Sequence, residues 1–133
     1  MSLERAEALR KGNYQQRAQA VAAVGEWAQT NREEGVALLQ QAYGNERSQW
    51  VRLEYQVTLY RLGDEAQLYQ MLLSLQSTRS ALRMRAVELL RSVLCAENQE
   101  RICHAMRLMA KKDPQPEIRT AAQEILETAG QNA

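Results

Sequence analysis

One arginine recurs near the start of four successive helical patterns, and this recurrence limits the folds that the chain can adopt. The four residues are Arg17, Arg52, Arg83 and Arg119, which lie 35, 31 and 36 residues apart. Counted from the residue before each arginine, small or apolar residues follow at +4, +7, +8 and +11, with Thr58 the polar exception. A period in this range is typical of stacked supersecondary units. We therefore expect a helical repeat protein.

Shorter amphipathic segments lie between these four patterns, and turn residues separate all of them. The separators include Gly12-Asn13, Gly44-Asn45 and Gly63-Asp64, which commonly end one helix and begin the next. No segment alternates as a strand would. The sequence predicts an all-α fold with a single repeat domain over residues 1–133. We expect four helical hairpins at approximately 3–29, 33–62, 65–95 and 98–129.

Three stretches carry a resemblance to a known family. They are Arg17-Ala18-Gln19-Ala20-Val21-Ala22-Ala23-Val24-Gly25, Leu82-Arg83-Met84-Arg85-Ala86-Val87-Glu88-Leu89-Leu90, and the turn Asp113-Pro114-Gln115-Pro116-Glu117-Ile118-Arg119. Together they resemble HEAT repeats, of the short type also seen in bacterial phycobilin-lyase-like proteins. The resemblance covers nearly the whole chain and implies an α-α superhelix, or solenoid. It implies little about function, because one fold hosts many functions.

The repeated arginines are expected to be structural. In the resembled family, the arginine forms a ladder with polar residues of the turns. The resemblance therefore assigns Arg17, Arg52, Arg83 and Arg119 to a structural ladder. Candidate partners in the turns are Asn13, Asn45 and Asp113, of which only Asp113 is charged.

The second helix of each hairpin lines the concave side of such a superhelix, which repeat proteins generally use for binding. Positions +2, +6 and +9 of each pattern point away from the core at 100° per residue. They predict an apolar patch with a polar rim, which is the anatomy of a protein interface. The predicted partner-binding residues are Leu53, Val57, Tyr60, Met84, Glu88 and Arg91. Two alternatives stay open: strong curvature could close the patch on itself, or a second copy of the chain could cover it.

Few residues suggest chemistry. Cys95, Cys103 and His104 are too few and too poorly spaced for tetrahedral zinc, which takes four ligands or three with water. Glu88 and Glu124 could approach each other across neighbouring hairpins, but no other catalytic motif accompanies them. We expect no catalytic residues, no metal and no cofactor, and thus a protein that is not an enzyme.

The charge balance gives no support for a nucleic-acid or lipid partner. Seventeen Lys and Arg residues against sixteen Asp and Glu residues give a net charge of +1, so no overall field favours nucleic acid or anionic lipid. The absence of a signal pattern and of a long apolar run predicts a cytoplasmic protein that does not enter membranes. The predicted function is an adaptor, scaffold or inhibitor module that binds another protein. The alternative is a phycobilin-lyase-like or nucleic-acid-acting repeat protein.

Overall fold

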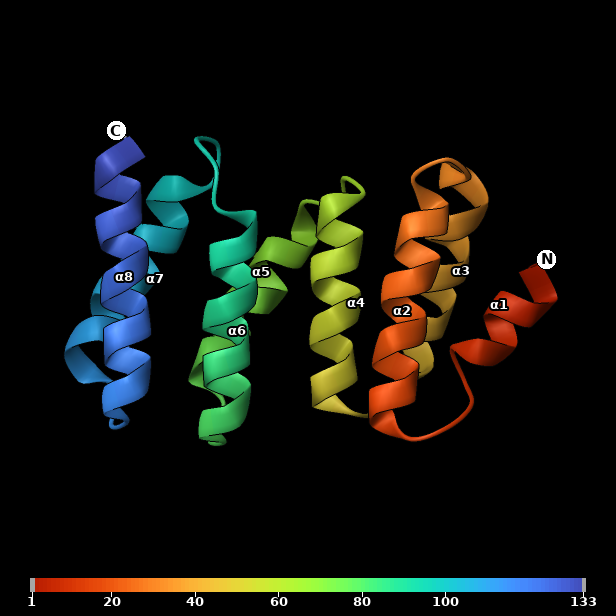
Figure 1. The fold of residues 1–133 in the computed structure, drawn as a ribbon, viewed down its shortest axis with the longest axis horizontal. Helices are drawn as coiled ribbons and strands as arrows, with labels where there is room; N and C mark the ends of the chain where they lie inside the picture. The colour runs from red at the N-terminus through yellow and green to blue at the C-terminus, as the bar shows by residue number, and fades with distance from the viewer. Residues whose placement is uncertain (1, 133) are drawn as a thin grey trace. The chain divides into compact units, whose positions relative to one another are not determined.

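The computed structural model describes residues 2–132, and the side chains of residues 3–130. All regular structure in this part of the chain is helical, as the all-α prediction requires. The helices are α1 (Ser2–Ala8), α2 (Tyr14–Ala28), α3 (Arg32–Asn45), α4 (Gln49–Arg61), α5 (Ala66–Leu73), the 3-10 helix η1 (Ser74–Gln76), α6 (Ser80–Val93), α7 (Gln99–Lys112) and α8 (Pro116–Asn132) (Figure 1). To within a few residues, each predicted hairpin range holds two consecutive α-helices.

The chain forms two compact units, Met1–Leu68 and Tyr69–Ala133. The boundary between them falls inside α5. Each unit contains its own helix pairs and its own repeated arginines, so each is described by itself. The predicted single repeat domain over residues 1–133 stays a prediction.

The first unit is built around α2, which packs against both α3 and α4. Figure 1 shows α2 beside α4, with α3 behind α2. Gly25 allows the close approach of α2 to α4, because a methyl group added to it would lie 2.5 Å from Cγ2 of Thr58. The buried apolar side chains of this unit's core are Leu9, Val21, Val24, Ala28, Leu39, Val51, Tyr55, Leu59 and Leu62.

The second unit packs α8 against both α7 and α6, and α6 against η1. The small residues Ala86 and Ala122, which hold the +4 position of their repeats, are fully buried. Apolar side chains of all three helices are buried, and they include Leu82, Leu89, Leu90, Ile102, Met106, Ile118 and Ile125. The +4, +7 and +8 positions are therefore buried in α6 and, apart from the partly exposed Leu126, in α8, as predicted.

Local sequence explains where the second helices of the first unit begin and end. Asn13 precedes α2, and its side chain accepts from the backbone N–H of Gln16 while the Gln16 side chain accepts from the N–H of Asn13, each at 2.9 Å. Ser48 caps α4 by accepting from the N–H of Val51. Gly63 follows α4 with φ of 107°, a conformation that glycine adopts without strain.

Candidate functional site

The four repeated arginines make the same contact in every copy. Each is the fourth residue of its helix, in α2, α4, α6 and α8. In each case Nη1 donates to a backbone carbonyl of the turn that leads into the helix. The pairs are Arg17 to Gly12 at 2.8 Å, Arg52 to Glu46 at 3.1 Å, Arg83 to Ser77 at 3.0 Å and Arg119 to Asp113 at 2.6 Å. These bonds fix each turn against its helix, which is the kind of contact expected of a structural role.

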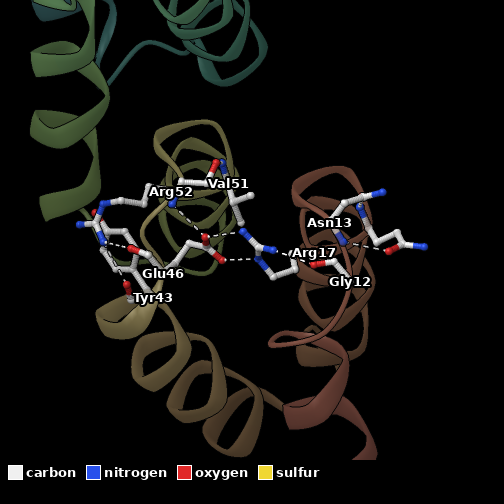
Figure 2. Close-up of polar contacts among 9 residues, drawn as sticks. Gly12, Asn13, Arg17, Tyr43, Glu46, Val51 and Arg52 are labelled. Carbon is white, nitrogen blue, oxygen red and sulfur yellow. Dashed lines mark hydrogen bonds and ion pairs between the residues drawn. The ribbon is translucent and has the colours of Figure 1, made fainter.

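Two of these arginines also hold a carboxylate in a bidentate ion pair. Arg17 donates to Glu46 through Nε at 2.9 Å and through Nη2 at 3.0 Å, as Figure 2 shows. Arg83 donates to Asp113 through Nε at 2.8 Å and through Nη2 at 3.2 Å. Parallel bonds of this kind combine charge with fixed geometry. We call these two pairs the clamps, and each compact unit contains one.

The carboxylate of each clamp also orders the turn that contains it. Glu46 accepts from the N–H of Ser48 at 3.0 Å, and Asp113 accepts from the N–H of Gln115 at 2.9 Å. Both acids stand six residues before a repeated arginine, Arg52 or Arg119. The clamps therefore join the turn of one repeat to the arginine of the repeat before it.

Only one of the three predicted turn partners takes part in a clamp. Asp113 does, as expected. Asn13 instead caps α2, and Asn45 donates to the carbonyl of Gln41 at 3.3 Å. The partner in the first unit is Glu46, which sequence reasoning missed. Its signal was present, because Glu46 occupies the same position before Arg52 that Asp113 occupies before Arg119.

The third repeat lacks a clamp acid. Ser77 stands where the second and fourth repeats have Glu46 and Asp113. Among the described residues, Arg52 accordingly has no carboxylate partner. It donates to the carbonyl of Tyr43 at 3.0 Å and lies over the Tyr43 ring, 4.2 Å from its centroid (Figure 2).

The surroundings of the clamp acids change their acidity. Burial by itself raises the pKa of Asp113, but the hydrogen bonds from Arg83 and Gln115 and the charges of Arg83 and Arg119 outweigh it, so the pKa lies below its ordinary value. For Glu46, burial likewise raises the pKa. The hydrogen bonds from Arg17 and from the N–H of Ser48, together with the charge of Arg17, lower it by more, so the net shift is again downward. Both groups are therefore ionised at neutral pH.

These shifts predict a loss of stability in acid. A carboxylate whose pKa is lower in the folded state contributes stability that is complete above its unfolded pKa of about 4 and disappears as the pH falls through the folded pKa. We expect the free energy of unfolding, measured by urea titration, to be level near neutral pH and to fall below about pH 4. The double variant Glu46→Gln and Asp113→Asn should have a flatter acid limb. An unchanged slope in that variant would show that other groups cause the acid sensitivity.

The predicted partner-binding residues are not all on the surface. Leu53 and Val57 on α4 are buried, with 2% and 1% of their surface exposed, so the expectation that they form an exposed apolar patch is wrong. The physical reason is that α4 is buried on two faces, one carrying Val51 and Tyr55 and the other carrying Leu53 and Val57. The periodicity identified both apolar faces of α4 but not that both would be covered.

The remaining four predicted residues retain some surface. Tyr60 on α4 and Met84 on α6 are half-buried, whereas Glu88 and Arg91 on α6 are exposed. Within the second unit, the outward face of α6 is therefore polar with one partly accessible apolar side chain. This face is more polar than the sequence suggested.

The first unit contains a solvent-open pocket of about 510 Å³ that sequence reasoning did not anticipate. Residues of α1 and the turn after it, the first turn of α2, the second half of α3 and the turn before α4 line this pocket. They are Ala6, Leu9, Arg10, Arg17, Leu38, Gln41, Ala42, Asn45, Glu46 and Arg47. The only sequence signal was the apolar pair Leu38 and Ala42, one turn apart on α3.

The outer face of α7 forms a second unanticipated surface. Its exposed basic side chains are Arg101, His104, Arg107, Lys111 and Lys112. The apolar side chain of Leu108 lies on the same helix and is 49% exposed. Ile102, Cys103 and Met106 occupy the buried face. No ion pair with another described residue neutralises this basic face. The 3.6-residue period of α7 could have revealed it.

Side chains that could bind a metal ion do not cluster in the described part of the chain. The part of the chain that the structure describes has no group of three or more His, Cys, Asp or Glu side chains that could hold a metal ion. Cys95 is exposed and Cys103 is buried, both as free thiols. None of the described helices is long and apolar enough to cross a membrane.

Comparison with known proteins gives no match. The chain matches no protein-family model, no curated protein and no solved structure. Function must therefore be inferred from the residues themselves.

Proposed function

We propose that the chain is a HEAT-like helical repeat protein that acts, without catalysis, as an adaptor, scaffold or inhibitor that binds another protein. In this proposal, the four hairpins form an α-α superhelix. The observation that carries the proposal is the arginine contact that recurs in all four copies. Sequence repeats need not share contacts, but here each copy ties its fourth helical residue to its own preceding turn.

Such a scaffold favours binding over chemistry. Repeat units that are fixed internally present the outer faces of their helices as a regular surface, and repeat proteins generally use that surface for recognition. The recurring cations are engaged by the turns and, at Arg17 and Arg83, by the clamps. Recognition therefore falls to side chains that the scaffold leaves exposed.

In the second unit, the face of α6 that carries Met84, Glu88 and Arg91 is the proposed contact, and in the first unit Tyr60 is retained as a candidate. Glu88 and Arg91 have opposite charges and lie almost one turn apart, so they can specify the orientation of a partner through charge complementarity. Met84 offers an adaptable apolar contact beside them.

A charge swap on α6 tests the proposal. The double variant Glu88→Arg and Arg91→Glu reverses the charge pattern but leaves the net charge unchanged. A tagged chain should capture a protein from native cell extract, and the swap should weaken capture about tenfold or more because opposite charges are replaced by like charges. Quantitative mass spectrometry of the eluates provides the measurement, and far-ultraviolet circular dichroism verifies folding.

The matched control is the swap Glu100→Arg and Arg107→Glu, two exposed residues on α7. It should leave capture within about twofold of the original chain, because exposed charges outside a contact have little effect. Equal capture by the α6 swap would contradict the proposed contact surface. Failure of the folded, unaltered chain to capture any protein would contradict the protein-binding function itself.

Nucleic-acid binding is a second candidate, and the basic outer face of α7 is the observation that favours it. Lys and Arg side chains without acidic partners can neutralise phosphates irrespective of sequence. The same capture experiment distinguishes this candidate. Capture that nuclease treatment of the extract abolishes, and that Arg101→Glu with Arg107→Glu on α7 weakens while the α6 swap does not, would replace the protein partner with a nucleic acid.

A further inference from the structure

The pocket of the first unit combines an apolar lining with a cationic rim. Ala6 and Leu9 contribute apolar surface from the first helix and the turn after it, and Leu38 and Ala42 contribute it from α3. Its volume of about 510 Å³ lies within the range of about 300–1,000 Å³ that is usual for pockets that enclose ligands. A pocket of this size accommodates one large side chain together with its neighbours in a peptide.

The charges around the pocket do not cancel. Three arginines and one glutamate line it, and Arg17 and Glu46 already neutralise each other in the clamp. Arg10 and Arg47 are exposed and form no ion pair with any residue the structure describes. Two positive charges therefore remain beside the apolar lining.

The walls of the pocket are held in place before any ligand arrives. Leu9 is 2% exposed and belongs to the core of the unit. The guanidinium group of Arg5 lies over the Trp27 ring, 3.9 Å from its centroid, and so holds α1 against α2. The clamp fixes the turn that contains Glu46. A preformed pocket loses less entropy on binding than one that must be ordered.

We infer that this pocket binds a segment of a partner protein in which a large apolar side chain stands next to an aspartate or glutamate. The apolar side chain would occupy the pocket lined by Leu9, Leu38 and Ala42, and the carboxylate would pair with Arg10 or Arg47. A nucleic-acid backbone would leave the apolar lining unused, and a purely apolar segment would leave both cations without partners. This inference rests on the proposed protein-binding function, but it concerns a different surface from the face of α6.

Selection from a random peptide library tests the inference directly, because it does not require the partner protein itself. Peptides displayed on phage are selected against the intact chain, and the enriched sequences are synthesised. We expect enrichment of Leu, Ile, Met or Phe adjacent to Asp or Glu. Affinities for the unaltered chain are then measured by fluorescence anisotropy, and they should weaken with added salt because the rim charges are exposed.

Two pairs of variants with the same change in net charge locate the binding site. Arg10→Glu with Arg47→Glu should weaken an enriched peptide about tenfold or more, since attraction at the rim becomes repulsion. Arg101→Glu with Arg107→Glu, on the exposed face of α7, should change the affinity by less than about twofold. Ala42→Met, which partly fills the pocket, should also weaken binding in a chain whose circular dichroism is unchanged.

Several results would overturn the inference. They are a selection that yields no binding peptide, enriched peptides without acidic residues, equal binding by the Arg10 and Arg47 double variant, or a loss confined to the α7 variant. The proposed function is judged separately by the extract experiment. A partner captured equally by the unaltered chain and the Arg10 and Arg47 double variant would refute the pocket and leave the protein-binding function standing.

Discussion

Replacing Asp113 with alanine is expected to lower the free energy of unfolding by about 3–5 kcal/mol. The side chains of Asp113 and Arg83 are 2% and 11% exposed, so the substitution leaves a buried guanidinium group without its counter-ion. The cost is mainly that uncompensated charge and the loss of two hydrogen bonds. The N–H of Gln115 also loses its acceptor. Urea unfolding followed by circular dichroism measures the change.

Two variants calibrate that expectation. Glu124→Ala, on the exposed face of α8, should change stability by no more than about 0.5 kcal/mol. The loss of stability for Glu46→Ala should lie between those of Asp113→Ala and Glu124→Ala, at about 1–3 kcal/mol. Arg17 is 22% exposed, so water can solvate it when its partner is removed. A loss of less than about 1 kcal/mol for Asp113→Ala would show that the clamp does not stabilise the second unit.

Replacing Tyr55 with alanine is expected to cost about 3–5 kcal/mol in the first unit. Tyr55 is fully buried among the core residues of this unit, and its ring stacks on Tyr43 with centroids 5.6 Å apart. Truncation removes the largest buried side chain of α4 and leaves a cavity beside Leu39 and Leu59. Thermal and urea unfolding of the variant should both show the loss.

The matched variant Tyr55→Phe separates the ring from its hydroxyl group. Burial raises the pKa of Tyr55 well above its ordinary value, so the hydroxyl stays protonated. It has no hydrogen-bond partner among the described residues. Removing an unpaired buried hydroxyl should therefore be neutral or stabilising by up to about 1 kcal/mol. A loss comparable to that of Tyr55→Ala would show that the hydroxyl, rather than the ring, contributes the stability.

The sequence was sufficient to predict the helices because helix periodicity and helix ends depend on local patterns, and the contact of each repeated arginine with its turn is equally local. A repeated arginine at the fourth residue of a helix can reach the carbonyls of the turn just before it, whatever the rest of the fold does. Glycine and asparagine in the separators mark the helix ends for equally local reasons. For this reason the predicted boundaries and the observed ones agree to within a few residues.

The candidate sites were harder to predict because they depend on which elements face each other. The pattern of α4 showed apolar residues on two sides, but periodicity does not say whether a second apolar face is covered, and Leu53 and Val57 are buried. The pocket needs α1, α3 and the turn at Glu46 to converge, and no spacing in the sequence encodes that convergence. Glu46 was overlooked because a turn acid is common and its register with Asp113 becomes meaningful only once both clamps are seen.

Site-specific photo-crosslinking tests the central claim of a protein-binding module most directly. A photoreactive amino acid is placed on the face of α6 in place of Ala81, in the pocket in place of Gln41, and on α7 in place of His104 as the control; all three side chains are exposed. The account predicts that irradiation in cells yields discrete protein adducts from the first two positions and none from the control. The absence of adducts at both test positions, or an adduct only at the α7 position, would contradict it.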